Sequence, residues 1–161
     1  MTVIQAAIRP SPLDDDAREG IRVMRHPIER PDGSALDLRA YLPACWGTAR
    51  PALCRLAAGG AADDRLARRL AALLGCVVVS VDYARGPDGP LPQALDDCYA
   101  GLAWLHSQTA LLKVDPHRVA VAAPAREGGL ALALLRLARR RRVFPIVCAL
   151  RIETLDDLQS L

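Results

Sequence analysis

The sequence is poor in aromatic residues, with two tryptophans, three tyrosines and one phenylalanine among 161 residues. Since 52% of the residues are nonetheless hydrophobic, alanine, leucine and valine must form most of the core. No apolar run approaches the ~20 residues of a membrane-spanning helix. The amino terminus also lacks the basic start and apolar stretch of a signal peptide. We therefore expect a cytoplasmic protein that does not associate with membranes.

The chain also lacks the patterns of metal, phosphate and nucleic-acid sites. Its five cysteines form no CxxC pair, and no metal-ligand spacing or phosphate-binding GxxxxGK[ST] loop is present. A net charge of +3 gives no reason to expect nucleic-acid binding. Unpaired cysteines in apolar segments are typical of a reduced, intracellular protein. We expect no cofactor, and the length suits one domain.

The alternation of apolar residues predicts an antiparallel hairpin followed by βα units. Residues 21–29 and 36–42 are the hairpin strands, joined by the turn-forming Pro31-Asp32-Gly33. Further strands are predicted at residues 51–57, 76–81, 118–123 and 143–150, and helices at 63–74, 93–106 and 127–138. This order predicts an α/β fold with a mostly parallel sheet. Residues 21–161 form the domain, and residues 1–20 an amino-terminal arm.

Two helices carry more specific expectations. The first begins near Asp63 or Asp64 as its cap, ends at Gly75 and buries a leucine stripe. This stripe consists of Leu66, Leu70, Leu73 and Leu74. The helix over 127–138 is apolar almost all round, which predicts a central position.

Three segments resemble the hormone-sensitive-lipase or acetyl-esterase family of α/β-hydrolases. They are VVSVDY at 78–83, LPQALDDCY at 91–99 and VDPHRVAVA at 114–122. The resemblance extends over roughly residues 20–150. It implies a three-layer α/β-hydrolase-like fold related to carboxylesterases and lipases. It also implies that the chain corresponds to the amino-terminal half of such an enzyme and lacks the carboxy-terminal part with the catalytic acid and histidine.

The resemblance places the nucleophile elbow, a G-x-S-x-G turn in the family, at residues 122–129. Counted from the strand, the serine position falls on Ala125; counted back from the glycines, it falls on Arg126. Neither side chain can attack a carbonyl, so we expect no catalytic residue here. The degenerate elbow comprises Ala123, Ala125, Arg126, Gly128 and Gly129.

The loop that would bind the oxyanion is similarly altered. The family's His-Gly-Gly-Gly segment corresponds to residues 57–60, where Ala57, Gly59 and Gly60 remain as the oxyanion-loop remnant. The histidine is absent, although backbone N–H groups could still be presented. Arg55 lies on the preceding inner strand, where an unpaired charge is costly. It requires either a partner or an open face of the sheet.

Other titratable residues have structural explanations. His26, His106 and His117 match no catalytic position of the family and are interpreted as ordinary histidines. Asp96 and Asp97 are adjacent on a helix, diverge, and suit capping and the helix dipole. The basic residues at 136 and 139–142 suit a helix carboxyl end; a docking site for an acidic protein or lipid surface is the alternative.

The sequence therefore predicts an inactive pseudo-esterase that acts, if at all, by associating with itself or with a partner protein. The predicted last strand, residues 143–150, is expected to be an exposed apolar edge that this association covers. An ester substrate is not expected. The alternative is an active ester hydrolase that uses non-standard residues such as Cys54 or Cys98, or that a second chain completes. A decaying gene fragment without a selected role is the third possibility.

Overall fold

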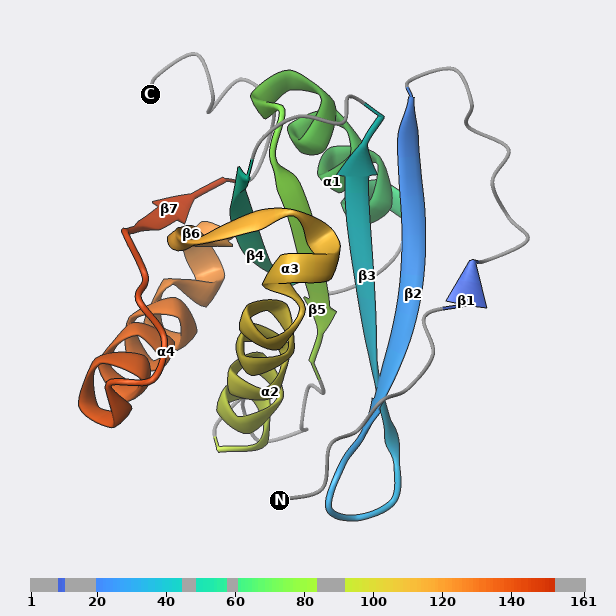
Figure 1. Cartoon of the computed structure of the whole chain (residues 1–161). Helices are drawn as coiled ribbons and strands as arrows, with labels where there is room; N and C mark the ends of the chain where they lie inside the picture. Colours follow the sequence, from blue (N-terminus) through green and yellow to red (C-terminus); the bar gives the residue numbers. More distant parts are fainter. Residues whose placement is uncertain (1–8, 11–19, 45–48, 58–60, 84–91, 153–161) are drawn as a thin grey trace.

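A computed structural model describes residues 9–10, 20–44, 49–57, 61–83 and 92–152, and Figure 1 shows its arrangement. The strands form one mixed sheet in the order β1-β2-β3-β5-β4-β6-β7. The strands are β1 (Arg9–Pro10), β2 (Ile21–Glu29), β3 (Ala35–Pro43), β4 (Arg50–Ala57), β5 (Val77–Asp82), β6 (Val114–Ala123) and β7 (Ala149–Arg151). The helices are α1 (Ala61–Leu74), α2 (Gln93–Ser107), α3 (Thr109–Leu112) and α4 (Gly128–Arg141).

The predicted hairpin is confirmed. β2 and β3 pair antiparallel along their whole length, from Ile21 opposite Pro43 to Glu29 opposite Ala35. The turn is held locally, because the Asp32 carboxylate accepts hydrogen bonds from the backbone N–H and the hydroxyl of Ser34. Gly33 has a φ of +83°, a conformation that glycine adopts without strain. Local turn chemistry therefore fixes the register of these strands.

The rest of the sheet is parallel, as predicted. β5 is antiparallel to β3, whereas β5, β4, β6 and β7 run parallel to one another. The carboxyl ends of these four strands consequently lie at one edge, and the elbow follows β6 at that edge. The boundary between an arm and a domain near residue 20 stays a prediction, although β1, within the predicted arm, pairs with β2.

Helices cover both faces of the sheet and give the predicted three layers (Figure 1). α1 packs on the face formed by Val23, Tyr41, Leu53 and Val78. α2 and α4 pack on the opposite face, where the larger cluster of buried leucines and valines lies. Gly101 lets α2 approach β5 closely, because a Cβ atom at this position would overlap the side chain of Val81.

The prediction for the inner face of α1 was partly wrong. Leu70 is buried, but Leu73 and Leu74 are 64% and 44% exposed. The small residues Ala67 and Ala71 lie inward instead. Asp63 and Asp64 lie in the first turn, not at the cap, because α1 begins at Ala61. Its end at Gly75, with a φ of +59°, is confirmed.

The predicted last strand was too long. β7 covers only Ala149–Arg151, and residues 143–148 are not part of the ladder. Two isolated hydrogen bonds, from Val147 N–H to Val119 O and from Val121 N–H to Cys148 O, hold this segment beside β6. Pro145 has no N–H to donate, which works against a continuous ladder.

The prediction of a central helix after the elbow was also wrong. α4 buries Leu130, Leu134 and Ala138, but Leu132 on its other side is 47% exposed. α4 therefore covers one face of the sheet and is open to solvent on the outside.

A buried ion pair joins the hairpin to α2. Arg30 Nε lies 2.8 Å from Asp97 Oδ1, and its Nη2 lies 2.9 Å from Asp97 Oδ2. The Asp97 side chain is only 2% exposed. The hydrogen bond with Asp97 raises the pKa of Arg30, so the guanidinium stays charged. Asp97 thus fixes the hairpin on the helix and does not act as a cap; Asp96 lies exposed in the first turn of α2.

Candidate functional site

The structure places the predicted elbow between β6 and α4. Ala123 ends β6, and a short 3-10 turn from Ala125 to Glu127 leads directly into α4. Ala125 is exposed, and the Arg126 side chain is 65% exposed, with its Nε 3.5 Å from the buried Glu127 carboxylate. The turn thus presents a methyl group and a guanidinium, neither of which is a nucleophile at neutral pH.

The backbone of the elbow also lacks the strain of a nucleophile turn. Among the described residues, positive φ angles occur at Lys113, Arg142 and three glycines outside the turn. Pro124 is extended with a φ of −60°, and Gly128 is helical with a φ of −58°. A hydrolase elbow holds its serine in a sharp, strained turn so that the hydroxyl projects above the sheet. The turn at residues 124–128 therefore has neither a serine nor a residue with positive φ.

Gly128 and Gly129 are not required for close packing. A Cβ atom built on either one meets no atom within 4 Å. In an active elbow, glycines at this point let the helix approach the strand. Here both residues simply occupy the first turn of α4, where alanine has the higher helix propensity.

Alanine substitutions are expected to have opposite effects at these glycines and at Gly101. Gly128→Ala or Gly129→Ala should raise the free energy of unfolding by about 0.5–1 kcal/mol through helix propensity. Gly101→Ala should lower it by about 1–3 kcal/mol, because the added methyl group overpacks against Val81. Urea unfolding followed by circular dichroism measures all three. A loss of stability in Gly128→Ala as large as in Gly101→Ala would contradict the open space and the unstrained backbone at Gly128.

The oxyanion side of the site is described only at its start. Ala57, at the position of the family's histidine, ends β4 and is 1% exposed. Gly59 and Gly60 lie outside the described residues. Ala57 is opposite Asp82 on β5, and the Asp82 carboxylate lies 3.7 Å from Arg39. The described part of the site therefore provides no imidazole on this side.

Arg55 has a partner that the sequence analysis did not identify. Its side chain is 2% exposed on the α1 face of the sheet, and its Nη2 lies 2.6 Å from Asp63 Oδ1 in the first turn of α1. Arg55 Nε and Nη1 make no hydrogen bond among the described residues. The next acidic residue, Asp64, accepts hydrogen bonds from Tyr41 and Arg68. These two carboxylates tie α1 to the sheet.

The three histidines lie away from the elbow. His26 is on β2, four strands from β6 in the sheet order, or about 19 Å at normal strand spacing. Its ring stacks on Trp104 with centroids 5.0 Å apart. His117 lies near the opposite end of β6, and His106 lies close enough to His117 for their charges to interact. Burial lowers the pKa of both His26 and His106. The interpretation of these residues as structural is consistent with this placement.

The thiols suggested as replacement nucleophiles are unsuitable. Cys54 and Cys98 are completely buried in the core. Burial raises the pKa of Cys54 to about 12 and that of Cys98 further above its usual value. Both therefore remain protonated at neutral pH, whereas the thiolate is the nucleophile. Ser80 is also buried, and it lies beside Arg39 and Arg55 on the neighbouring strands.

A small apolar pocket of about 210 Å³ lies beside the elbow. Ala123, Ala125 and Gly128 form its elbow side, and Leu132 and Leu150 line it from α4 and β7. It can hold a small apolar group but provides no group that can activate one. The described residues contain no cluster of three potential metal ligands and no helix long and apolar enough to cross a membrane.

A mixed sheet covered by helices on both faces, in which a strand leads through a turn into a helix, is the framework of the α/β-hydrolase fold. The sequence profile of a family described as the alpha/beta hydrolase fold matches residues 56–160. The chain therefore belongs to the α/β-hydrolase family, in its hormone-sensitive-lipase branch.

Individual relatives are named both as enzymes and as a receptor. Carboxylesterase NlhH from Mycobacterium tuberculosis is 40% identical over 76 residues, which cover 47% of this chain and 24% of that protein. The Gibberellin receptor GID1A from Arabidopsis thaliana is 48% identical over 54 residues, covering 34% of this chain and 16% of the receptor. A solved hyperthermophilic esterase from Pyrobaculum calidifontis superposes with a TM-score of 0.69 at 33% identity, covering 80% of this chain and 42% of the esterase. The chain thus spans less than half the length of each.

Proposed function

We propose that this chain is a pseudo-esterase, a hydrolase-fold protein that acts by association and not by ester hydrolysis. The elbow is the observation that carries this proposal. Positions 125 and 126 bear a methyl and a guanidinium group, and the turn around them is unstrained. Acyl transfer needs a nucleophile and a base within hydrogen-bond reach. Among the described residues, the turn after β6 carries no serine, cysteine or histidine, and its carboxylate, that of Glu127, is buried.

The range of relatives supports a non-catalytic role. One similar protein is named as a gibberellin receptor, so the relatives of this chain include a protein named for binding. Carboxylesterase NlhH is named as an enzyme, so ester hydrolysis is the alternative function that an experiment must distinguish from binding. Since the fold is kept and the elbow is degenerate, binding is the role that the described residues can support.

The surface around β7 is where we place the association. β7 is the last strand in the sheet order and pairs only with β6 among the described residues. Val147, just before it, is 62% exposed, and Leu132 on α4 lines the adjacent pocket. An unpaired strand edge beside exposed apolar side chains favours pairing with another chain. A second copy can pair antiparallel through this edge about a two-fold axis.

Light scattering after size-exclusion chromatography tests the association. The unmodified chain should elute at the mass of a dimer at micromolar concentration. Val147→Asp and Leu132→Asp should each shift it to the monomer, because a charge at the interface is costly to bury. Leu73→Asp, at an exposed leucine on the opposite face, should leave the dimer intact. A monomeric unmodified chain would contradict the proposed self-association.

A steady-state assay with short aryl esters tests the absence of catalysis. We expect no turnover above the buffer rate for the unmodified chain or for Ala125→Ser. The added hydroxyl would still lack an imidazole base, because the three histidines lie elsewhere in the sheet and on α2. Circular dichroism checks that the variant is folded. Turnover by Ala125→Ser would contradict the account of the elbow.

A further inference from the structure

Arginines gather at the carboxyl end of α4. This α4 arginine surface consists of Arg136, Arg139, Arg140, Arg141 and Arg142, which are all exposed. The helix itself, Gly128–Arg141, contains no acidic residue. In Figure 1 its carboxyl end lies at the outer lower left of the molecule, away from β7. The surface is therefore separate from the β7 edge, which adjoins the first half of α4.

The charges of the α4 arginine surface lack acidic partners within the described part of the chain. The ion pairs formed by the described residues involve other arginines, and none includes Arg136, Arg139, Arg140 or Arg142. Arg141 lies over the Tyr99 ring, with its Cζ 4.4 Å from the ring centroid. This contact holds Arg141 against α2 but supplies no negative charge. The surface thus keeps a concentrated positive charge.

The helix dipole explains only part of this clustering. The carboxyl end of a helix carries the equivalent of roughly −0.5 charge, far less than five guanidinium groups. Arg139 and Arg140 follow Arg136 at the spacings at which like charges on a helix repel each other. Arg142 has a φ of 50°, a left-handed position where glycine or asparagine is usual. These arginines therefore lower stability where they stand, and a bound anionic group would relieve their repulsion.

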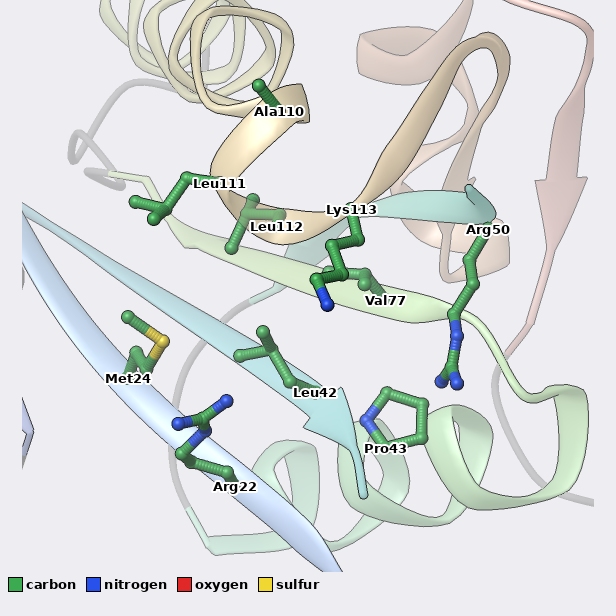
Figure 2. Close-up of a pocket in the computed structure, with 10 residues that line it drawn as sticks. All are labelled: Arg22, Met24, Leu42, Pro43, Arg50, Val77, Ala110, Leu111, Leu112 and Lys113. Carbon is green, nitrogen blue, oxygen red and sulfur yellow. The ribbon is translucent and has the colours of Figure 1, made fainter. Parts of the chain in front are cut away.

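A second group of basic side chains is less open to an anion. Arg22, Arg50 and Lys113 line a pocket of about 440 Å³ at the amino ends of the parallel strands (Figure 2). Arg22 and Lys113 already make interactions of their own. The α4 arginine surface is therefore the stronger candidate for an anionic partner.

The size and setting of the surface favour a short acidic protein segment over a nucleic-acid duplex or a bilayer. Residues 136–142 span about 9 Å along the helix axis, and four acidic residues in an extended chain span about 10 Å. Duplex binding commonly engages about 6–10 phosphates, more than this surface can contact. A helix that binds a bilayer needs a free apolar face, whereas α4 buries Leu130, Leu134 and Ala138 against the rest of the domain.

We propose that the α4 arginine surface binds an acidic segment of a partner protein, in which neighbouring Asp or Glu carboxylates pair with the guanidinium groups. A planar guanidinium can donate two parallel hydrogen bonds to one carboxylate, which gives such pairs their geometric specificity. The surface lies at the other end of α4 from β7, so its occupation does not depend on the proposed self-association.

Titration of the full isotope-labelled chain with hexaglutamate, followed by NMR, tests the proposal. In about 0.1 M salt the amide signals of residues 136–142 should shift, with a Kd on the order of 0.1–1 mM, because exposed ion pairs are individually weak. Hexaglutamine has the same length without the charges and should cause no shifts. If hexaglutamate left these signals unchanged, or hexaglutamine shifted them equally, the proposal would be overturned.

A pair of double variants locates the binding. Arg139→Gln/Arg140→Gln should weaken hexaglutamate binding by about 5-fold, since it removes two guanidinium groups from the surface. Arg65→Gln/Arg69→Gln removes the same charge from exposed positions of α1, on the opposite face of the sheet, and should leave the Kd nearly unchanged, because salt screens distant charges. Circular dichroism checks that both variants are folded. Equal Kd values for the two variants would contradict binding at α4.

Two further probes decide the class of partner. Hexathymidylate presents phosphates on a single strand, and vesicles of equal parts phosphatidylcholine and phosphatidylserine present them on a bilayer. At equal concentrations of negative charge, both should shift the signals of residues 136–142 less than hexaglutamate does. Tighter binding of hexathymidylate or of the vesicles would assign the surface to nucleic acid or to a membrane and would refute the acidic protein segment.

Discussion

Asp63→Ala is expected to lower the free energy of unfolding by about 3–5 kcal/mol, a large effect for a half-buried residue near a helix start. Arg55 is 2% exposed, and the Asp63 carboxylate 2.6 Å away is its charged partner. The other guanidinium nitrogens, Nε and Nη1, make no hydrogen bond among the described residues. Removing the carboxylate would therefore leave a buried positive charge without compensation.

Arg55→Met should behave differently. It removes the buried charge together with its desolvation penalty, and methionine fills a comparable apolar volume. We expect a change in stability of less than about 1 kcal/mol, in either direction. Combining Arg55→Met with Asp63→Ala should restore most of the stability lost in Asp63→Ala alone.

Urea unfolding monitored by circular dichroism compares these variants, with Arg65→Met at an exposed position of α1 as the control. The control should change stability by less than about 0.5 kcal/mol. A larger loss of stability in Arg55→Met than in Asp63→Ala would contradict this account. It would mean that the ion pair contributes net stability and that Asp63 does more than compensate the buried charge of Arg55.

The second large effect is expected at the Arg30–Asp97 ion pair, which joins the β2–β3 hairpin to α2. Arg30→Met should lower the free energy of unfolding by about 3 kcal/mol, because it leaves the buried Asp97 carboxylate without its bidentate partner. The double variant Arg30→Met/Asp97→Asn should recover part of this loss, since a neutral amide is less costly to bury. The resulting coupling energy should be about 2 kcal/mol.

An exposed arginine provides the control. Arg140 lies exposed near the end of α4, so Arg140→Met should cost less than about 0.5 kcal/mol. The same urea titrations measure both substitutions. If the effects of Arg30→Met and Asp97→Asn on stability were simply additive, the two residues would not be energetically coupled, which would contradict the role of their ion pair in holding the hairpin on α2.

The hairpin shows what local chemistry makes predictable. The limits of β2 agree with the sequence prediction, and those of β3 agree within one residue at each end. Asp32 and Gly33 fix the turn through contacts within three residues, and the strands then alternate inward and outward. The strand, turn and helix around residues 122–129 were likewise predictable, because they are contiguous in sequence.

Features that depend on distant contacts were not predictable. The Arg55–Asp63 and Arg30–Asp97 pairs form only after separate elements meet, so sequence patterns could show the charges but not their partners. Leucine periodicity misassigned the inner face of α1, because this face accommodates the small Ala67 and Ala71. The absence of backbone strain in the turn after β6 follows from its φ angles, which residue types alone do not specify.

The most direct test of an inactive elbow is treatment of the intact chain with a reactive fluorophosphonate, followed by intact-mass and peptide mass spectrometry. An activated nucleophile would displace fluoride and retain the phosphonyl group covalently. The account predicts an unchanged mass for the unmodified chain, while an active serine esterase in the same reaction is fully labelled. A phosphonyl adduct on any side chain of residues 123–129 would contradict it.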